Sequence, residues 1–470
     1  MADHVGSGDD GHAGDGHGTA GNGTAGNRDS GNGTARSGAA GRPDNDGGSD
    51  SGTGGGGGTG GGHAGDGKTA TGALAGATKR GALAGAIFLM ATSAIGPGFI
   101  TQTTEFTAQL GAAFAFAIVL SIVVDIAVQL NVWRVIGVSG LRAQELGNRV
   151  LPGVGYLMAA LVVLGGLVFN VGNVAGTSLG LDALFGLDVK IGGTISAAVA
   201  IAIFVSKRAG VAMDRLVVVL GFVMIALTTY VAVSSSPPVG EAMRQAVVPD
   251  TIDVLVITTL IGGTVGGYIT YAGAHRLVDS GVSGPDEVAR VSRSSVTALL
   301  VTGVMRVVLF LAILGVVAGG AALTGGNPTA EAFGHAAGEV GMRLFGMVLW
   351  AAGITSVIGA SYTSVSFLVS FSPALKRRQN LLVAGFIVVS AVGFVLLDQA
   401  PTTLLILAGA LNGLILPVGF GVLMWVAARR SDLLGGYRYP RWLLVIGVAA
   451  WLLTLYLGWN SLSGIADLWS

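Results

Sequence analysis

Apolar residues form eleven runs along this chain that are long enough to cross a bilayer. A transmembrane helix needs about 20 consecutive apolar residues. The fourth run is short, and the first, third and eighth are long. This pattern predicts an all-α integral membrane protein with about eleven transmembrane helices. The runs cover residues 81–110, 112–133, 152–180, 191–206, 214–234, 253–276, 295–320, 341–370, 381–397, 402–428 and 441–461.

Composition separates an N-terminal tail from the membrane domain. Residues 1–72 are rich in Gly with Asp, Ser, Thr and Asn, and they contain almost no large apolar residue. Such a segment cannot bury enough surface to offset the entropy of ordering it, and it lacks the apolar core of a signal peptide. We therefore expect a disordered Gly-rich tail over 1–72 and a transporter domain over 73–470. Across the whole chain, only 11% of residues are charged and cysteine is absent.

Basic residues orient the predicted spans. Alternate loops carry sixteen Lys and Arg on the side of the tail and three on the opposite side. The positive-inside rule places the basic loops in the cytoplasm. The sequence thus predicts a multi-pass protein of the plasma membrane with a cytoplasmic N-terminus and an external C-terminus. The sixteen are Arg134, Arg142, Arg149, Lys207, Arg208, Arg215, Arg276, Arg290, Arg293, Lys376, Arg377, Arg378, Arg429, Arg430, Arg438 and Arg441, against Lys190, Arg244 and Arg343.

Two of the spans contain helix-breaking residues. The first span is interrupted by Gly96-Pro97-Gly98, and the sixth contains TTLIGGTVGGYITYAGAHRL. Spans one and six are matching members of two five-helix halves, which enter the membrane from opposite sides because five is odd. This arrangement predicts a 5+5 inverted repeat, with repeat one at about 81–235, repeat two at about 253–428 and an extra helix at about 441–461.

Interrupted helices have a physical meaning in a membrane. Backbone groups freed in mid-bilayer are tolerated only around a protein-lined or watery cavity, and paired breaks in an inverted repeat mark the binding site of a transporter. The alternative is a pair of kinked helices whose glycines allow close packing. The candidate substrate-binding residues at the breaks are Gly96, Pro97, Gly98, Phe99, Gln102, Glu105, Gly263, Thr264, Gly267, Tyr268 and Tyr271.

Ionisable residues inside spans are candidates for coupling. Asp125 lies mid-way along the second span, Arg306 near the middle of the seventh and His275 near the cytoplasmic end of the sixth. Charged groups in the bilayer are costly and are therefore functional candidates. Asp125 with Arg306 also fits a purely structural pair, Arg306 has Glu105 as another possible partner, and His275 fits a hydrated interfacial position.

The chain resembles the Nramp (natural resistance-associated macrophage protein) divalent-metal transporters over about residues 80–430. The clearest segment is VFNVGNVAGTSLGLDALFGLDV in the third span, with Gly176-Thr177 and Leu184-Phe185-Gly186. Gln129 and the loop from Lys207 to Asp214 are also similar. The resemblance implies the leucine-transporter fold, with eleven or twelve spans and broken helices one and six.

Three sites depart from the family pattern. The metal-binding Asp-Pro-Gly-Asn of the family is replaced by Gly96-Pro97-Gly98-Phe99, and Met-Pro-His-Asn by Tyr268-Ile269-Thr270-Tyr271. The Asp and Glu of the family's proton route correspond to Asn170 and Asn173, which we retain as coupling candidates. A rebuilt site for a hard cation would use Glu105 with backbone carbonyls. Without a carboxylate in the break, the site also suits a small anionic solute.

These observations predict an ion-coupled secondary transporter of the Nramp-like superfamily that imports a divalent cation, manganese- or magnesium-like, by alternating access. The alternative is a symporter of a small anionic organic solute or amino acid on the same fold. The sequence has no H-E-x-x-H, G-x-S-x-G or nucleotide-binding motif, so we expect no enzyme activity. We also expect no cofactor and no nucleic-acid partner. The expected partners are the transported ion or solute and the lipid bilayer.

Overall fold

The computed structural model describes residue 81 and residues 95–467, which are helical and contain no strand. The predicted tail over 1–72 and most of the first half of the first span lie outside this part. The helices are α2 (Pro97–Leu110), η1 (Gly111–Ala113), α3 (Phe114–Ser139), α4 (Ala143–Val150), α5 (Val154–Phe185), α6 (Val189–Val205), α7 (Lys207–Ser234), α8 (Val239–Val247), α9 (Val254–Thr264), α10 (Ile269–Asp279), η2 (Pro285–Glu287), α11 (Val288–Ala318), α12 (Pro328–Val369), α13 (Pro373–Arg377), α14 (Gln379–Leu397), α15 (Pro401–Arg429), α16 (Arg441–Asn460) and α17 (Leu462–Asp467).

Local sequence sets many of the helix ends. Gly140 and Gly186 terminate α3 and α5 in the left-handed conformation that glycine adopts without strain. Asp188, Asp253 and Asn327 precede α6, α9 and α12, and each side chain accepts a hydrogen bond from the first turn of its helix. These side chains satisfy donors that a helix N-terminus would otherwise leave unpaired.

Eight helical segments of the described chain are long and apolar enough to cross a membrane. The bent pair of α7 and α8, with 104° between its members, is a ninth candidate. The sequence predicts about eleven spans, and the difference from this number of long apolar helices has two local causes. The turn at Gly111–Ala113 joins α2 and α3 into one stretch, and α6 has only 17 residues. When these helices are counted separately, each predicted run corresponds to a helix, the first only in part.

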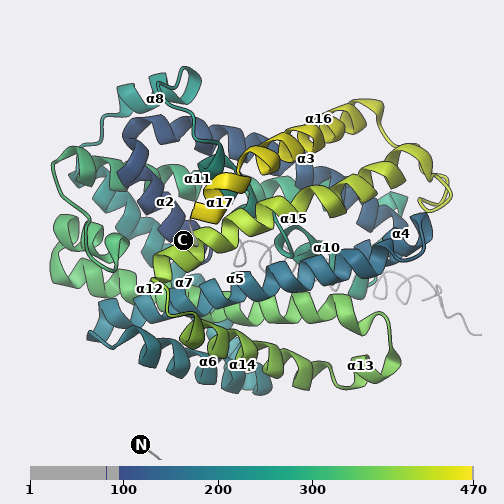
Figure 1. Ribbon diagram of the computed structural model, residues 1–470, viewed down its shortest axis with the longest axis horizontal. Helices are drawn as coiled ribbons and strands as arrows, with labels where there is room; N and C mark the ends of the chain where they lie inside the picture. Colours follow the sequence, from purple (N-terminus) through teal and green to yellow (C-terminus); the bar gives the residue numbers. More distant parts are fainter. Residues whose placement is uncertain (1–80, 82–94, 468–470) are drawn as a thin grey trace, which may run out of the picture. The chain divides into compact units, whose positions relative to one another are not determined.

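Small residues bring α5 and α12 into close contact. A side chain at Gly180 would meet the backbone of Trp350, and one at Gly346 would meet the Gly180 carbonyl. Gly166 likewise lies against Ser364. Close approach through small residues is how membrane helices gain packing energy without a hydrophobic driving force. In Figure 1, α14 and α6 lie beside α5 and α12 on the same side of the bundle.

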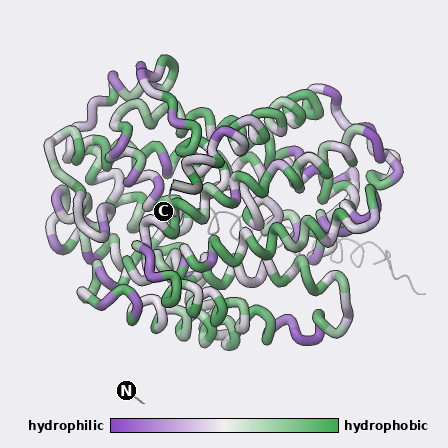
Figure 2. Tube along the Cα trace, in the orientation of Figure 1, coloured by the Kyte–Doolittle hydropathy of each residue, from purple (hydrophilic) through white to green (hydrophobic). Residues whose placement is uncertain are grey.

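The outer faces of the helices are apolar. Large hydrophobic side chains such as Phe222, Val389 and Trp442 are exposed on α7, α14 and α16. Figure 2 shows hydrophobic colouring along most helices, with hydrophilic segments concentrated in the connections. Polar residues are instead found inside, where Gln102, Asn170, Asn173 and many Ser and Thr side chains are buried. Apolar outer faces combined with buried polar side chains among the apolar core are typical of a multi-pass membrane protein.

Candidate functional site

The predicted break in the sixth span is present. α9 ends at Thr264, α10 begins at Ile269, and four residues between them leave the helical path. Gly267 has a φ of +51°, which favours glycine, and a side chain there would overlap Asn412 Oδ1. Asn412 on α15 donates from Nδ2 to the carbonyls of Gly165 and Ala408. The break is therefore filled by a buried amide from a neighbouring helix.

The break in the first span marks the start of α2. Gly96 is in an extended conformation, and Pro97 occupies the first helical turn, where its missing N–H costs nothing. The ring of Pro97 packs against Gly176 of α5, where a Cβ would overlap it, and close to Gly353 of α12. A Cβ on Gly96 would lie 2.7 Å from Ser356 Oγ and 3.7 Å from Asn173 Oδ1. The N-terminus of α2 thus faces polar groups of α5 and α12.

Gln102 connects the two interrupted spans. Its Nε2 donates to the carbonyl of Leu405 at 3.0 Å, and its Oε1 is buried without a partner. A Cβ on Gly263 of α9 would lie 2.6 Å from this Oε1, and one on Gly409 of α15 would overlap Nε2. Two glycines therefore make the space that this amide occupies between α2, α9 and α15.

A second polar group beside the breaks centres on Arg306. Its Nη2 donates to Thr264 Oγ1 at 2.9 Å, and its guanidinium carbon lies 4.4 Å from the centroid of the Phe99 ring. Nη1 reaches Ser121 on α3 at 3.5 Å. Asp125, also on α3, interacts electrostatically with this arginine and lies beside Thr264. Of the two partners considered from sequence, the structure thus places Asp125 near Arg306.

The other candidate residues occupy different places. Glu105 is half-buried and lies eight residues into α2, about 12 Å from its start at 1.5 Å per residue. Asn170 donates to Ser361 and Ser390, whereas neither amide atom of Asn173 has a hydrogen-bond partner. Asn170 therefore joins α5 to α12 and α14, and Asn173 remains available near the break.

Two aromatic candidates lie at the α10 side of the α9–α10 break, Tyr268 directly before α10 and Tyr271 in its first turn. The rings of Tyr268 and Phe169 are 5.5 Å apart in an edge-to-face arrangement. Tyr271 packs against His275 and Phe367, with ring centroids 5.9 and 5.4 Å away. The two tyrosines thus contact α5 and α12 respectively, and together they fix α10 against these helices.

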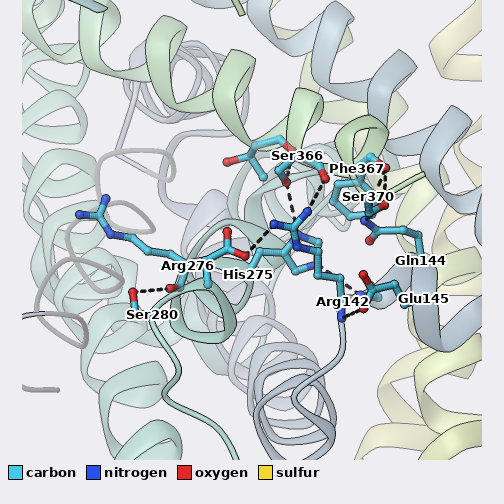
Figure 3. Close-up of polar contacts among 12 residues, drawn as sticks. Arg142, Gln144, Glu145, His275, Arg276, Ser280, Ser366, Phe367 and Ser370 are labelled. Atoms are coloured by element: carbon cyan, nitrogen blue, oxygen red, sulfur yellow. Dashed lines mark hydrogen bonds and ion pairs between the residues drawn. The ribbon is translucent and has the colours of Figure 1, made fainter. Parts of the chain in front are cut away.

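His275 belongs to a network that sequence reasoning missed. Its Nε2 accepts from the Ala143 backbone N–H at 3.3 Å, and its Nδ1 lies 3.4 Å from Ser366 Oγ. Arg142 donates to the Ser366 carbonyl at 2.9 Å and pairs with Asp279 at 2.6 Å. Figure 3 shows Arg142, His275 and Ser366 converging from three elements. We call Arg142, Asp279 and Ser366 the latch, because they join α10 and α12 to the turn before α4.

No group of three His, Cys, Asp or Glu side chains suited to a metal ion occurs among the described residues. The carboxylates of Glu105 and Asp125 lie on different helices, α2 and α3. A divalent ion bound among the described residues would therefore need backbone carbonyls, hydroxyls or amides among its ligands. Hard cations accept such oxygen sets.

Comparison with known proteins decides the family. The family described as natural resistance-associated macrophage protein-like, or Nramp, matches residues 87–463. The chain belongs to the Nramp family. Nramp proteins are transporters rather than enzymes, and this chain is accordingly a multi-pass membrane transport protein. The resemblance seen in the sequence is thereby confirmed.

Two bacterial relatives are similar over most of their length. The chain is 52% identical over 389 residues to the uncharacterized membrane protein YcsG of Bacillus subtilis, covering 83% of this chain and 96% of the relative. It is also 52% identical over 369 residues to an uncharacterized membrane protein of Haemophilus influenzae, covering 78% and 92%.

Solved structures show the fold. A manganese transporter of Eremococcus coleocola, in complex with an aromatic bis-isothiourea compound, has a TM-score of 0.65 at 17% identity, covering 82% of this chain and 86% of that one. MhsT in complex with L-phenylalanine has a TM-score of 0.57 at 16% identity, covering 80% and 98%. This Nramp chain therefore has the leucine-transporter-like fold.

Proposed function

We propose that this protein is an ion-coupled secondary transporter that works by alternating access, with its cargo bound between the two interrupted spans. The observation that supports this most directly is the buried contact of Gln102, in the second turn of α2, with Gly263 near the end of α9 and Gly409 of α15. Interrupted backbone in the bilayer interior is tolerated where it lines a binding cavity. Paired interruptions of this kind form the midplane sites of secondary transporters.

The proposed orientation is a cytoplasmic N-terminus and an external C-terminus in the plasma membrane. Support comes from the latch, which joins the turn before α4 to the ends of α10 and α12. Arg142 precedes α4, Arg149 lies in its last turn and Arg276 lies in the last turn of α10. The short helix α13, beyond α12, carries Lys376 and Arg377. Basic groups therefore gather at the face that the positive-inside rule assigns to the cytoplasm.

Membership of the Nramp family favours a divalent metal ion as the imported cargo. The structural relatives named above include a manganese transporter, and the sequence resemblance is to divalent-metal transporters. In this protein Glu105 would supply the carboxylate. Because it lies about 12 Å along α2 from the first break, the other ligands would be oxygens closer to Glu105 than that break. Oxygen donors of this kind suit partly hydrated magnesium or manganese.

A small anionic solute is the second candidate, and Arg306 is the observation that favours it. This permanently charged side chain is 1% exposed beside both breaks. A cargo charge of +1 that lies 4 Å from the Arg306 guanidinium, at an effective dielectric constant of 20, would be repelled by about 4 kcal/mol. MhsT, which has the same fold, was solved with an amino acid, a carboxylate-bearing cargo.

Flux into sealed proteoliposomes distinguishes the two cargo classes. Vesicles containing the full-length protein would be loaded with a divalent-sensitive dye and offered manganese, then magnesium, with and without an inward proton gradient. Gradient-dependent entry supports metal import. Absence of entry with either ion, in vesicles that respond to an added ionophore, would exclude these ions as cargo.

Glu105→Gln tests the proposed metal ligand. The change removes a carboxylate charge while keeping its size, so manganese or magnesium uptake is expected to fall at least about tenfold, which corresponds to roughly 1.4 kcal/mol. Glu339→Gln is the matched control, because Glu339 is an exposed acid on α12. Equal metal uptake by the two variants would show that Glu105 is not a ligand.

A further inference from the structure

Arg306 lies where both interrupted spans meet α11. Its guanidinium stacks on Phe99, in the first turn of α2, and donates to Thr264, the last residue of α9. One side chain therefore touches the helix ends on both sides of the proposed cargo site. The sequence predicts both of these contact residues, Phe99 and Thr264, to bind substrate.

The neighbouring groups do not fully compensate the positive charge of Arg306 or satisfy all of its hydrogen-bond donors. Its Nε has no hydrogen-bond partner, and its contact with Ser121 is at the long limit of 3.5 Å. Asp125 acts on it electrostatically, yet this pair is absent from the ion pairs found in the described part of the chain. Asp125 Oδ1 is itself buried without a partner. A guanidinium stays charged in proteins and is costly to bury without full pairing.

We propose that Arg306 binds the carboxylate of a small organic solute, which makes the cargo of this transporter an organic anion. This inference rests on the proposed transport function and names its substrate class. The planar guanidinium presents paired N–H donors that match a carboxylate in a two-point contact. Asp125 then balances Arg306 when the site is empty, and the cargo carboxylate takes over that role when it is bound.

The surroundings limit the cargo to a compact molecule. Gly263, the residue before Thr264, lies against Gln102, whose Oε1 has no partner. Asn173, near Gly96, also has both amide atoms unpartnered and is 0% exposed. The unpaired amide atoms of Gln102 and Asn173 can each make a polar contact, while Phe99 supplies an apolar wall. These groups suit a short carboxylate with one or two further polar atoms.

Ligand-dependent thermal stabilisation of the purified full-length protein tests this assignment. The probes are sodium lactate, sodium pyruvate and sodium succinate, each compared with its uncharged amide, and manganese and magnesium chloride. Glutamate and proline are tested beside them without an amide comparison. We expect at least one carboxylate to raise the melting temperature in a saturable way, while its amide does not. Arg343→Gln, an exposed arginine on α12, is the matched control and should keep this response.

The decisive variant pairs Arg306→Gln with Asp125→Asn. Because both charges are removed together, the double variant avoids leaving Asp125 as an uncompensated buried charge. It is expected to require at least tenfold more carboxylate for the same stabilisation, with an unchanged gel-filtration profile. An unaltered response, or no stabilisation of the wild type by any carboxylate of the set, would overturn the proposal.

Counterflow in proteoliposomes separates the inference from the transport function. If the stabilising carboxylate is exchanged in a saturable way and this exchange is lost in the double variant, the result supports both carboxylate binding by Arg306 and the transport function. Binding without exchange would leave the Arg306 site standing and refute transport of that solute. Manganese uptake that persists at full rate in the double variant, without carboxylate binding, would support transport and refute the assignment of Arg306.

Discussion

Replacing Gly262 by alanine is expected to destabilise the protein and to abolish transport. A Cβ at this position of α9 would overlap the carbonyl oxygen of Gly409 and the backbone of Gly413 on α15. Both neighbours are main-chain atoms of a packed helix, so neither can rotate away as a side chain would. Overpacking of this kind costs about 1–3 kcal/mol and sometimes more. We expect the upper end of that range for Gly262→Ala.

Gly385→Ala is the matched control for this prediction. Gly385 lies inside α14, and a Cβ there would meet nothing within 4 Å. Alanine is the better helix former by about 1 kcal/mol, so this variant is expected to be neutral or slightly more stable. The measurement is the melting temperature in detergent, followed by uptake in proteoliposomes. Equal melting temperatures for the two variants would show that α9 and α15 separate easily.

Replacing Arg142 by glutamine is expected to make the interior of the protein more accessible from the face that carries α4. Arg142 pairs with Asp279 of α10 and donates to the Ser366 carbonyl of α12, so its loss removes two contacts of the latch. Hydrogen bonds to charged groups contribute about 1.5–3 kcal/mol, and partial exposure reduces this figure. A shift of about 1.4 kcal/mol would make the open state about tenfold more populated.

The absence of cysteine from the chain makes this shift measurable. Ser364→Cys places one thiol at a buried position of α12, next to Gly166. Its labelling by a membrane-impermeant maleimide, added from the α4 side, is expected to become about tenfold faster in Arg142→Gln. Asp279→Asn should also increase the rate of labelling. Arg244→Gln, an exposed ion-pair residue on α8, should leave the rate unchanged, and an equal rate in Arg142→Gln would contradict the latch.

The breaks in the two spans could be predicted from sequence because their causes are local. Proline lacks an N–H and glycine adopts positive φ without strain, so GPG and a cluster of four glycines favour an interruption of the helix. The structure confirms the second break at residues 265–268 and begins α2 at Pro97. The same patterns could not reveal what fills the breaks, because Asn412 reaches Gly267 from a helix that is distant in the chain.

The sequence by itself determined the membrane class, the candidate spans and the family, because these depend on hydrophobic length, glycine position and short motifs. It also identified Arg306 and Asp125 as unusual, since charges are rare in spans. Only the tertiary structure decided that Arg306 lies against Phe99 and Thr264, whereas Glu105 lies two turns along α2 from the break. It alone revealed the latch around Arg142. These contacts join residues distant in the chain, and helix packing, which no local pattern encodes, brings them together.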